Sequence, residues 1–258
     1  MYPIDYNSYR SVKSFNRRVR FLIMHYTSQN FKDSINTLTG NRPDHLVSAH
    51  YLVPDPSEQT YIDAGFKELR IFNLVEENER AWHAGVSWWS DRTNINDNSI
   101  GIEIVNEAND GPFLPFNQKQ IEAVAELSKN ILQRYPDITP VNVVGHSDIA
   151  PGRKSDPGAA FPWKELYQAG IGAWPDADTV EEYRAKFTSQ GLPERSAVIN
   201  LLNKYGYSTK TANTDNGFKQ LIRAFQLHFR QAKYDGELDV ETAAILAALC
   251  EKYKKIKS

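Results

Sequence analysis

The order of segments predicts an α/β fold with a mixed central β-sheet flanked by helices, followed by a small C-terminal three-helix domain. In residues 1–177, apolar runs of strand length alternate with an amphipathic segment of helix length, the pattern of a sheet covered by helices. Beyond residue 193, three amphipathic helical segments follow one another. We therefore expect one domain at 1–177, a connecting helix or linker at 178–193 and a second domain at 194–258.

The first strand is predicted at Val19–Met24, which is almost entirely apolar and is followed by His25. A continuous apolar run of this length is typical of a strand that is buried on both faces. The run Ser48–Val53 also has strand character. A further buried strand is expected at Val141–Val144, where three of the four residues are valine.

The segment that begins after Asn117 is predicted to be a helix. Asn117 and Gln120 form an N-cap pair, and Pro136 ends the helix after Tyr135. The apolar stripe of this helix comprises Ile121, Val124, Ile131 and Leu132.

The segment from Gly145 to Gly158 places His146, Lys154 and Asp156 in one stretch bent by proline and glycine. We expect His146 where the preceding strand runs out into a loop. Together with His25, these residues have the composition of an open zinc site, with three protein ligands and a fourth position left to water. On spacing alone, each also has an ordinary explanation: a hydrogen-bonded histidine, a turn-forming aspartate or a solvated lysine.

A glutamate stands within the predicted strand Ser99–Asn106. Three isoleucines alternate onto one face there, so Glu103 points to the other face beside Gly101. Either that face is solvated, or the carboxylate has a task that offsets the cost of its burial. We favour a task, in which Glu103 faces the metal and Gly101 leaves room for a ligand.

The segment Arg80–Trp89 is rich in aromatic residues and glycine, with three tryptophans in its last eight positions. Tryptophans in such a segment pack in a core or form a pocket wall for a sugar or another flat ligand. We expect the pocket wall. His45 is expected in a loop, and His228 in a C-terminal helix, where it packs or caps.

The C-terminal segment is predicted to contain helices at Ser196–Tyr205, Phe218–Arg230 and Val240–Tyr253. Their order and the turn at Asp235-Gly236 resemble the three-helix peptidoglycan-binding domain. A bundle that only stabilises the enzyme or mediates oligomer contacts is the alternative.

Together with Ser48–Val53 and Gly170–Pro175, the motifs above resemble the zinc-dependent N-acetylmuramoyl-L-alanine amidases of the type 2 amidase family. The similarity is greatest to the AmpD- and AmiD-like bacterial enzymes, in particular the larger AmpD homologues with an extra C-terminal domain. The resemblance covers nearly the whole chain and keeps the family order of motifs.

This resemblance implies one Zn²⁺ per chain, held by His25, His146 and Asp156, with Glu103 as the catalytic carboxylate and Lys154 as the transition-state cation. Non-catalytic relatives among the peptidoglycan recognition proteins typically lack the third ligand, which is present here as Asp156. The residues expected to bind the substrate are His50, Trp82, His83, Trp88 and Arg153, although a core position for His50 is an equal alternative.

The predicted activity is hydrolysis of the amide bond between N-acetylmuramic acid and L-alanine of the peptidoglycan stem peptide, in polymeric wall and in anhydro-muropeptides. The alternatives are a peptidoglycan sensor that binds without cutting and a zinc peptidase that acts within the stem peptide. The sequence contains no Gly-x-Ser-x-Gly elbow, Walker-type phosphate loop or Gly-x-Gly-x-x-Gly fingerprint. Cys250 lies in an apolar helix and is expected to be inert.

Composition is that of a globular protein, with 41% hydrophobic and 24% charged residues. The net charge of −2 gives no electrostatic footprint for nucleic acid, and no apolar run reaches the ~20 residues of a membrane span. A single cysteine excludes an internal disulfide. The sequence does not fix the oligomeric state, and a homo-oligomer is one of the alternatives.

The first residues, 1–6, lack a secretory hydrophobic region. The inferred substrate places the protein at the bacterial cell wall or in the periplasm, after removal of a signal or through specialised export. A cytoplasmic location is the alternative.

Overall fold

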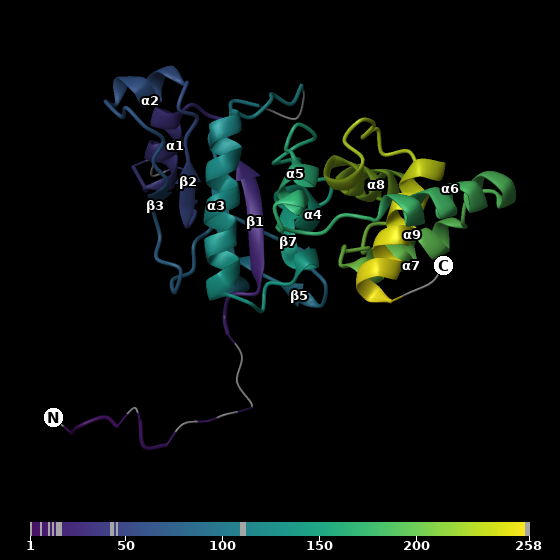
Figure 1. Cartoon of the computed structure of the whole chain (residues 1–258), viewed down its shortest axis with the longest axis horizontal. Coiled ribbons are helices and arrows are strands. Elements are labelled where there is room, and N and C mark those ends of the chain that lie inside the picture. The colour runs from purple at the N-terminus through teal and green to yellow at the C-terminus, as the bar shows by residue number, and fades with distance from the viewer. Residues whose placement is uncertain are drawn as a thin grey trace.

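A computed structural model describes residues 2–5, 7–9, 11, 13, 17–41, 44, 46–108 and 112–255. It contains a five-stranded sheet beside a group of C-terminal helices (Figure 1). The strands are β1 (Phe21–Tyr26), β2 (Tyr51–Val53), β3 (Phe72–Asn73), β4 (Trp88–Trp89), β5 (Arg92–Thr93), β6 (Ser99–Ile104) and β7 (Val143–Gly145). The helices are α1 (Phe31–Leu38), α2 (Gln59–Asp63), α3 (Gln118–Arg134), α4 (His146–Ile149), α5 (Trp163–Gln168), α6 (Ala177–Gln190), α7 (Arg195–Tyr205), α8 (Asp215–Phe229) and α9 (Val240–Lys254).

The sheet is mixed, as predicted. Its strand order is β3-β2-β6-β1-β7, in which β2, β6, β1 and β7 run parallel to their neighbours and β3 is antiparallel to β2. Strands β4 and β5 form a separate antiparallel pair. The central strand β1 therefore lies between β6 and β7.

The two faces of the sheet differ in chemistry because side chains alternate along each strand. Leu22 and Met24 of β1 share a hydrophobic cluster with α3. The isoleucines of β6 (Ile100, Ile102 and Ile104) and the apolar face of α3 (Ile121, Val124, Leu127 and Ile131) complete this cluster. Phe21 and Ile23 point to the opposite face and pack in a second cluster.

The predicted helix after Asn117 is confirmed as α3. The Asn117 side chain accepts a hydrogen bond from the Lys119 N–H, and Tyr135 is the C-cap. The three predicted C-terminal helices are also confirmed, as α7, α8 and α9. One local expectation was wrong: His146 does not enter a loop but begins the short helix α4. The side chain of Asp148 accepts a hydrogen bond from the Gly145 N–H and so supports this helical turn.

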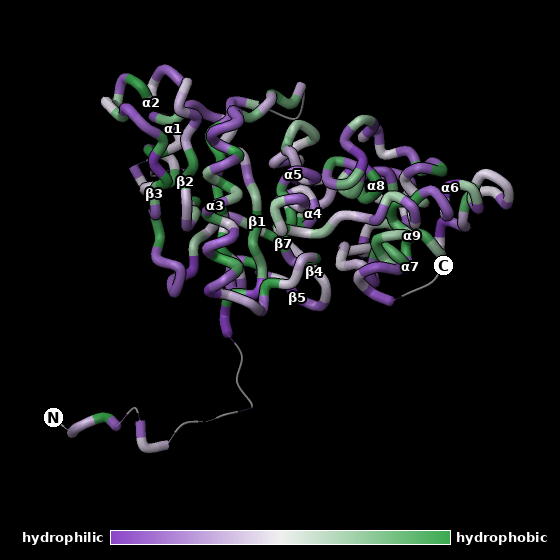
Figure 2. The backbone as a smooth tube through the Cα atoms, in the orientation of Figure 1, coloured by the Kyte–Doolittle hydropathy of each residue, from purple (hydrophilic) through white to green (hydrophobic). Residues whose placement is uncertain are grey.

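The C-terminal helices pack onto the second face of the sheet. Their hydrophobic cluster includes residues of α6–α9 together with Phe21, Ile23 and Val144 of the sheet. Figure 2 shows hydrophobic residues along β1 and within the C-terminal helices, as well as on α3. Within the described residues, no helix has the length and hydropathy needed to cross a membrane.

Trp89 of β4 links the two parts of the chain. It is fully buried, its indole Nε1 donates to the Val141 carbonyl at 3.0 Å, and its ring packs edge-on against Tyr207 with centroids 4.8 Å apart. A Cβ added to Gly206 would lie 2.7 Å from the Trp89 ring, so this contact leaves no space for a side chain at position 206.

We expect Trp89→Ala to lower the free energy of unfolding by about 3–5 kcal/mol, because it leaves a cavity where a large buried ring had been. Denaturant unfolding measures this change. Trp82→Ala is the matched control, since the Trp82 side chain is 52% exposed. Equal effects of the two substitutions would contradict the central packing role of Trp89.

Candidate active site

Three side chains predicted as metal ligands converge at the end of β1. The Nδ1 atom of His25 lies 3.0 Å from Nδ1 of His146 and 3.0 Å from Oδ2 of Asp156, and the latter two atoms are 3.1 Å apart. All three residues are buried. Two imidazole nitrogens and one carboxylate oxygen at these separations form a cluster that can hold a metal ion.

The register of the sheet explains the convergence. His25 of β1 is paired with Glu103 of β6, and the preceding residue, Met24, is paired with Gly145 of β7. Side chains at paired positions of parallel neighbours point to the same face. His25 therefore lies between Glu103 and His146.

The electrostatic surroundings favour the states that a metal ligand requires. Burial lowers the pKa of His25 to about 4, although the Asp156 carboxylate partly offsets the effect. The imidazole is therefore neutral at pH 7. Burial acts to raise the pKa of Asp156, but the neighbouring His146 and His25 hold it well below its usual range. The carboxyl group is therefore ionised.

The second nitrogen of each imidazole is fixed by the surrounding protein. The Nε2 atom of His25 lies 2.9 Å from Nδ1 of His83, and Nε2 of His83 lies 3.1 Å from the Ser99 hydroxyl. The Nε2 atom of His146 lies 3.0 Å from the Ala84 carbonyl. Both predicted ligands therefore turn Nδ1 toward the cluster, and such outer contacts orient metal-binding histidines.

We expected Gly101 to leave room for a ligand, and this expectation was wrong. The space beside Gly101 is occupied by the His83 ring. A Cβ added at this position would lie 2.5 Å from the His83 ring. The glycine is needed so that the ring can reach His25 across the strand.

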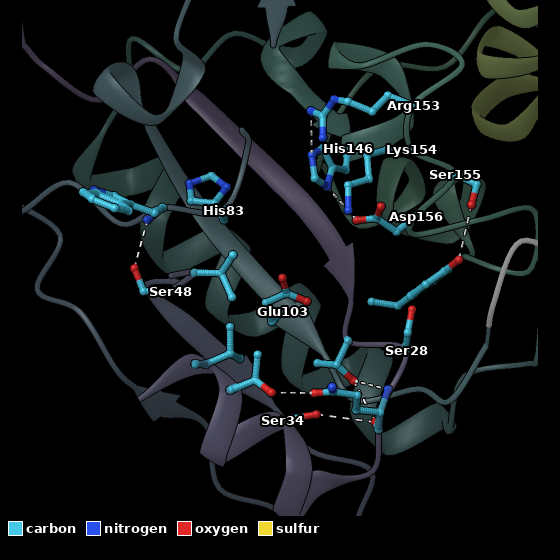
Figure 3. A pocket seen from close by; sticks show the side chains of 17 residues that line it. Ser28, Ser34, Ser48, His83, Glu103, His146, Arg153, Lys154, Ser155 and Asp156 are labelled. Carbon is cyan, nitrogen blue, oxygen red and sulfur yellow. Dashed lines mark hydrogen bonds and ion pairs between the residues drawn. The ribbon is translucent and has the colours of Figure 1, made fainter. Parts of the chain in front are cut away.

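Glu103 faces the cavity from the same face of the sheet (Figure 3). Its Oε2 atom is buried and has no hydrogen-bond partner among the described residues. Burial raises the pKa of the Glu103 carboxyl well above its usual range, the charge of Asp156 adds to this rise, and Lys154 counteracts it. A carboxyl group with a raised pKa and a buried, unpartnered oxygen is typical of a group that transfers protons.

The cavity has a volume of about 510 Å³. Three predicted residues, Lys154, Arg153 and Trp82, line it beside the ligands. The Arg153 guanidinium donates to the carbonyls of Ala84 and Val86 at 2.8 and 2.7 Å. These hydrogen bonds connect the Gly145–Gly158 segment to the Arg80–Trp89 segment. His83 also lines the cavity, although it is largely buried.

Two residues predicted to bind the substrate are not part of this cavity. His50 is fully buried, its Nδ1 accepts the Gly101 N–H at 3.0 Å, and its Nε2 lies 3.3 Å from the Glu79 carbonyl. Its place is in the core, the alternative left open by the sequence. Trp88 lies in β4 and contacts Lys210, whose ammonium is 4.5 Å from the ring centroid. His45 lies outside the described residues.

Sequence reasoning missed Asn96, which supports the aromatic segment. Its Oδ1 atom accepts hydrogen bonds from the backbone N–H groups of His83 and Ala84, at 3.1 and 2.8 Å. The residue is buried. In the sequence, Asn96 is an asparagine in a largely polar stretch, and this pattern does not distinguish it from an asparagine in a surface loop.

We expect Gly101→Ala to weaken metal binding by about 10–100-fold, because the added methyl group displaces His83 and with it the contact to His25. Competition with a chromogenic chelator measures the affinity. Ile102→Val, a buried change on the opposite face of β6, is the control and should leave metal affinity unchanged. Wild-type affinity in Gly101→Ala would show that His83 does not orient His25.

Comparison with known proteins agrees with the site and with the fold. The family model described as N-acetylmuramoyl-L-alanine amidase matches residues 15–159, and a peptidoglycan binding domain model matches residues 192–246. The N-acetylmuramoyl-L-alanine amidase AmiD of Escherichia coli is 45% identical over 249 residues, which are 95% of this chain and 87% of AmiD.

Two solved structures are similar over almost the full chain. AmpDh3 from Pseudomonas aeruginosa has 56% identity and a TM-score of 0.94, with 98% of this chain and 100% of that chain covered. The structure of AmiD from E. coli in complex with anhydro-N-acetylmuramic acid-L-Ala-D-gamma-Glu-L-Lys has 42% identity and a TM-score of 0.85, with 98% of both chains covered. With the amidase family model matched over more than half of the chain and with 45% identity to the amidase AmiD over 95% of it, the chain belongs to the N-acetylmuramoyl-L-alanine amidase family.

Proposed function

We propose that the protein is a zinc hydrolase that cleaves the amide bond between the lactyl group of N-acetylmuramic acid and L-alanine of the stem peptide. The observation that carries this proposal is the buried cluster of His25, His146 and Asp156, of which His146 and Asp156 line a cavity that Glu103 also lines. AmpDh3 has been solved in complex with anhydromuramic pentapeptide, which supports anhydro-muropeptides as one substrate class.

Zinc fits the donor set. Two imidazoles and one carboxylate suit this ion, and three protein ligands leave a position open. The contacts of His83 and of the Ala84 carbonyl with the far sides of the imidazoles are those expected around a zinc site. When bound, zinc would lower the pKa of water toward ~7 and polarise a carbonyl group.

Glu103 is proposed to handle the protons of the reaction. It would accept a proton from the attacking water and pass it to the leaving nitrogen of L-alanine. Burial raises the pKa of its carboxyl group well above the usual range, which strengthens the carboxylate as a base that accepts the proton of water.

Lys154 is proposed to stabilise the oxyanion that develops on the scissile carbonyl. It follows Arg153 and precedes the ligand Asp156 by two residues, and its charge acts on both Glu103 and His25. Arg153 and Trp82 are proposed to contact the substrate at the cavity wall. A flat, half-exposed indole suits the face of a sugar ring.

We further propose that polymeric peptidoglycan is a substrate, so that the protein acts at the bacterial cell wall or in the periplasm. The match of residues 192–246 to a peptidoglycan binding domain model supports this reading. The domain division at residues 177 and 193 remains a prediction; α6 occupies most of the proposed connecting segment and shares the core of α7–α9.

Asp156→Ala should abolish zinc binding and turnover together, whereas Glu103→Gln should keep zinc and lower kcat by about 10²–10⁴-fold. The reason is that only the first substitution removes a ligand. Zinc content by atomic absorption and release of stem peptide are measured on the same samples. A fully active Glu103→Gln enzyme would refute the proton-transfer role.

Lys154→Met should lower kcat by about 10²–10³-fold, the usual loss for one oxyanion donor, while KM changes less. Steady-state kinetics on a soluble muropeptide separates the two constants. Lys129→Met, at an exposed position on α3, is the charge-matched control. An increase in KM alone would instead assign Lys154 to substrate binding.

The proposed function is tested by mass spectrometry of sacculi and of soluble anhydro-muropeptides after incubation with the enzyme, with and without a zinc chelator. We expect free stem peptides that begin with L-alanine, and their loss on chelation. Binding to sacculi without peptide release would indicate a sensor, and fragments cut within the stem would indicate a peptidase.

A further inference from the structure

A second buried polar cluster lies behind the metal ligands. Its centre is Asp148, which is fully buried in α4, two residues after the ligand His146. A carboxylate removed from water is costly unless several donors satisfy it. The buried side chain of Asp148 therefore needs several hydrogen-bond donors.

The catalytic part of the chain supplies one of the donors recorded for this carboxylate. The Gly145 N–H donates to Oδ2 of Asp148 at 2.7 Å. The other two come from the C-terminal helices and the turn between them: the Tyr207 hydroxyl donates to Oδ1 at 2.5 Å, and Nδ1 of His228 lies 2.7 Å from Oδ2.

His228 is held rigidly in this position. Its ring stacks on Trp163 of α5, with centroids 3.8 Å apart and an angle of 17° between the planes, and on Phe229 at 3.9 Å. Its Nε2 atom has no partner among the described residues. The ring therefore has one recorded polar contact, with Asp148, so the Nδ1–H tautomer is the one that satisfies both residues.

The helical turn that Asp148 anchors contains the proposed ligand His146 and is hydrogen-bonded to the backbone of the proposed ligand Asp156. His146 is its first residue, and the Ser147 N–H donates to the Asp156 carbonyl at 2.9 Å. Gly145 is packed so closely that an added Cβ would lie 2.7 Å from Pro157. A shift of α4 would therefore move His146 and Asp156 together.

We propose that Tyr207 and His228 are positioning residues of the metal centre. They complete the hydrogen-bond shell of Asp148 and thereby fix α4, which contains His146 and is hydrogen-bonded to Asp156. The C-terminal helices are then a structural part of the active site in addition to any part they play in wall binding. This inference rests on the proposed zinc site.

The test uses the full-length protein and four variants. Tyr207→Phe removes one donor, and His228→Phe keeps a flat stacking ring without a donor. His228→Asn keeps a donor near the position of Nδ1 but loses the ring. Tyr205→Phe is the control, because Tyr205 is buried in the same core and has no recorded hydrogen bond to Asp148. Zinc affinity is measured by chelator competition, and site geometry by the visible spectrum of the cobalt-substituted protein.

We expect Tyr207→Phe and His228→Phe to weaken zinc binding by about 10–100-fold and to alter the cobalt spectrum, as loss of outer contacts does at other metal sites. His228→Asn should retain most of the affinity, and Tyr205→Phe should match the wild type. Should His228→Phe fail to fold, Tyr207→Phe carries the test alone, since it removes a single oxygen atom.

Three results would overturn the inference. Unchanged zinc affinity and cobalt spectrum in Tyr207→Phe and His228→Phe, whatever their melting temperatures, would leave these residues with a role in stability only. Loss of zinc affinity in His228→Asn together with wild-type affinity in His228→Phe would assign the effect to ring stacking. A wild-type protein that binds no zinc would refute the proposed metal centre as well.

Discussion

The parallel pairing of β1 with β6 and β7 is the constraint on which the site depends. This pairing sets His25 beside Glu103. It also pairs Met24 with Gly145, so that His25 and His146 are the next residues along the two strands. A shift of one residue in either register would turn one of these side chains to the α3 face, because the side-chain period of a strand is two. The apolar packing of the isoleucines of β6 against α3 opposes such a shift. The hydrophobic core thus fixes the spacing of the polar site.

Much of this arrangement could be predicted from the sequence because it depends on short-range patterns. Alternation along Ser99–Asn106 placed Glu103 opposite the isoleucines, and the buried runs before His25 and His146 placed both histidines at the ends of strands. Apart from the helical turn at His146, the errors concern contacts between distant segments. Neither the use of Gly101 as space for His83 nor the enclosure of His50 can be read from local pattern, since each depends on a partner at least 18 residues away.

The same limit applied to His228 and Asp148, which are 80 residues apart. In the sequence, the histidine lies among phenylalanines on a helix, and packing in the helical core was the natural expectation. That expectation was correct for its ring and incomplete for its Nδ1 atom. A buried polar atom needs a partner, so a histidine on an apolar helix face signals a polar partner in the adjoining part of the fold without identifying it.

The position of the cavity follows from how the second face of the sheet is covered. At the beginning of β1, Phe21 and Ile23 are covered by the cluster that includes Trp89 and the C-terminal helices. Two residues beyond Ile23, the same face places His25 against His146 and Asp156, which line the cavity. On this face of β1, Ile23 therefore belongs to the hydrophobic core, whereas His25, two residues later, belongs to the candidate metal site. The C-terminal helices seal the apolar half, and Tyr207 extends from them to the turn that holds the ligands. On the proposed role of Tyr207, the contact between the two parts of the chain that buries the core also positions the site.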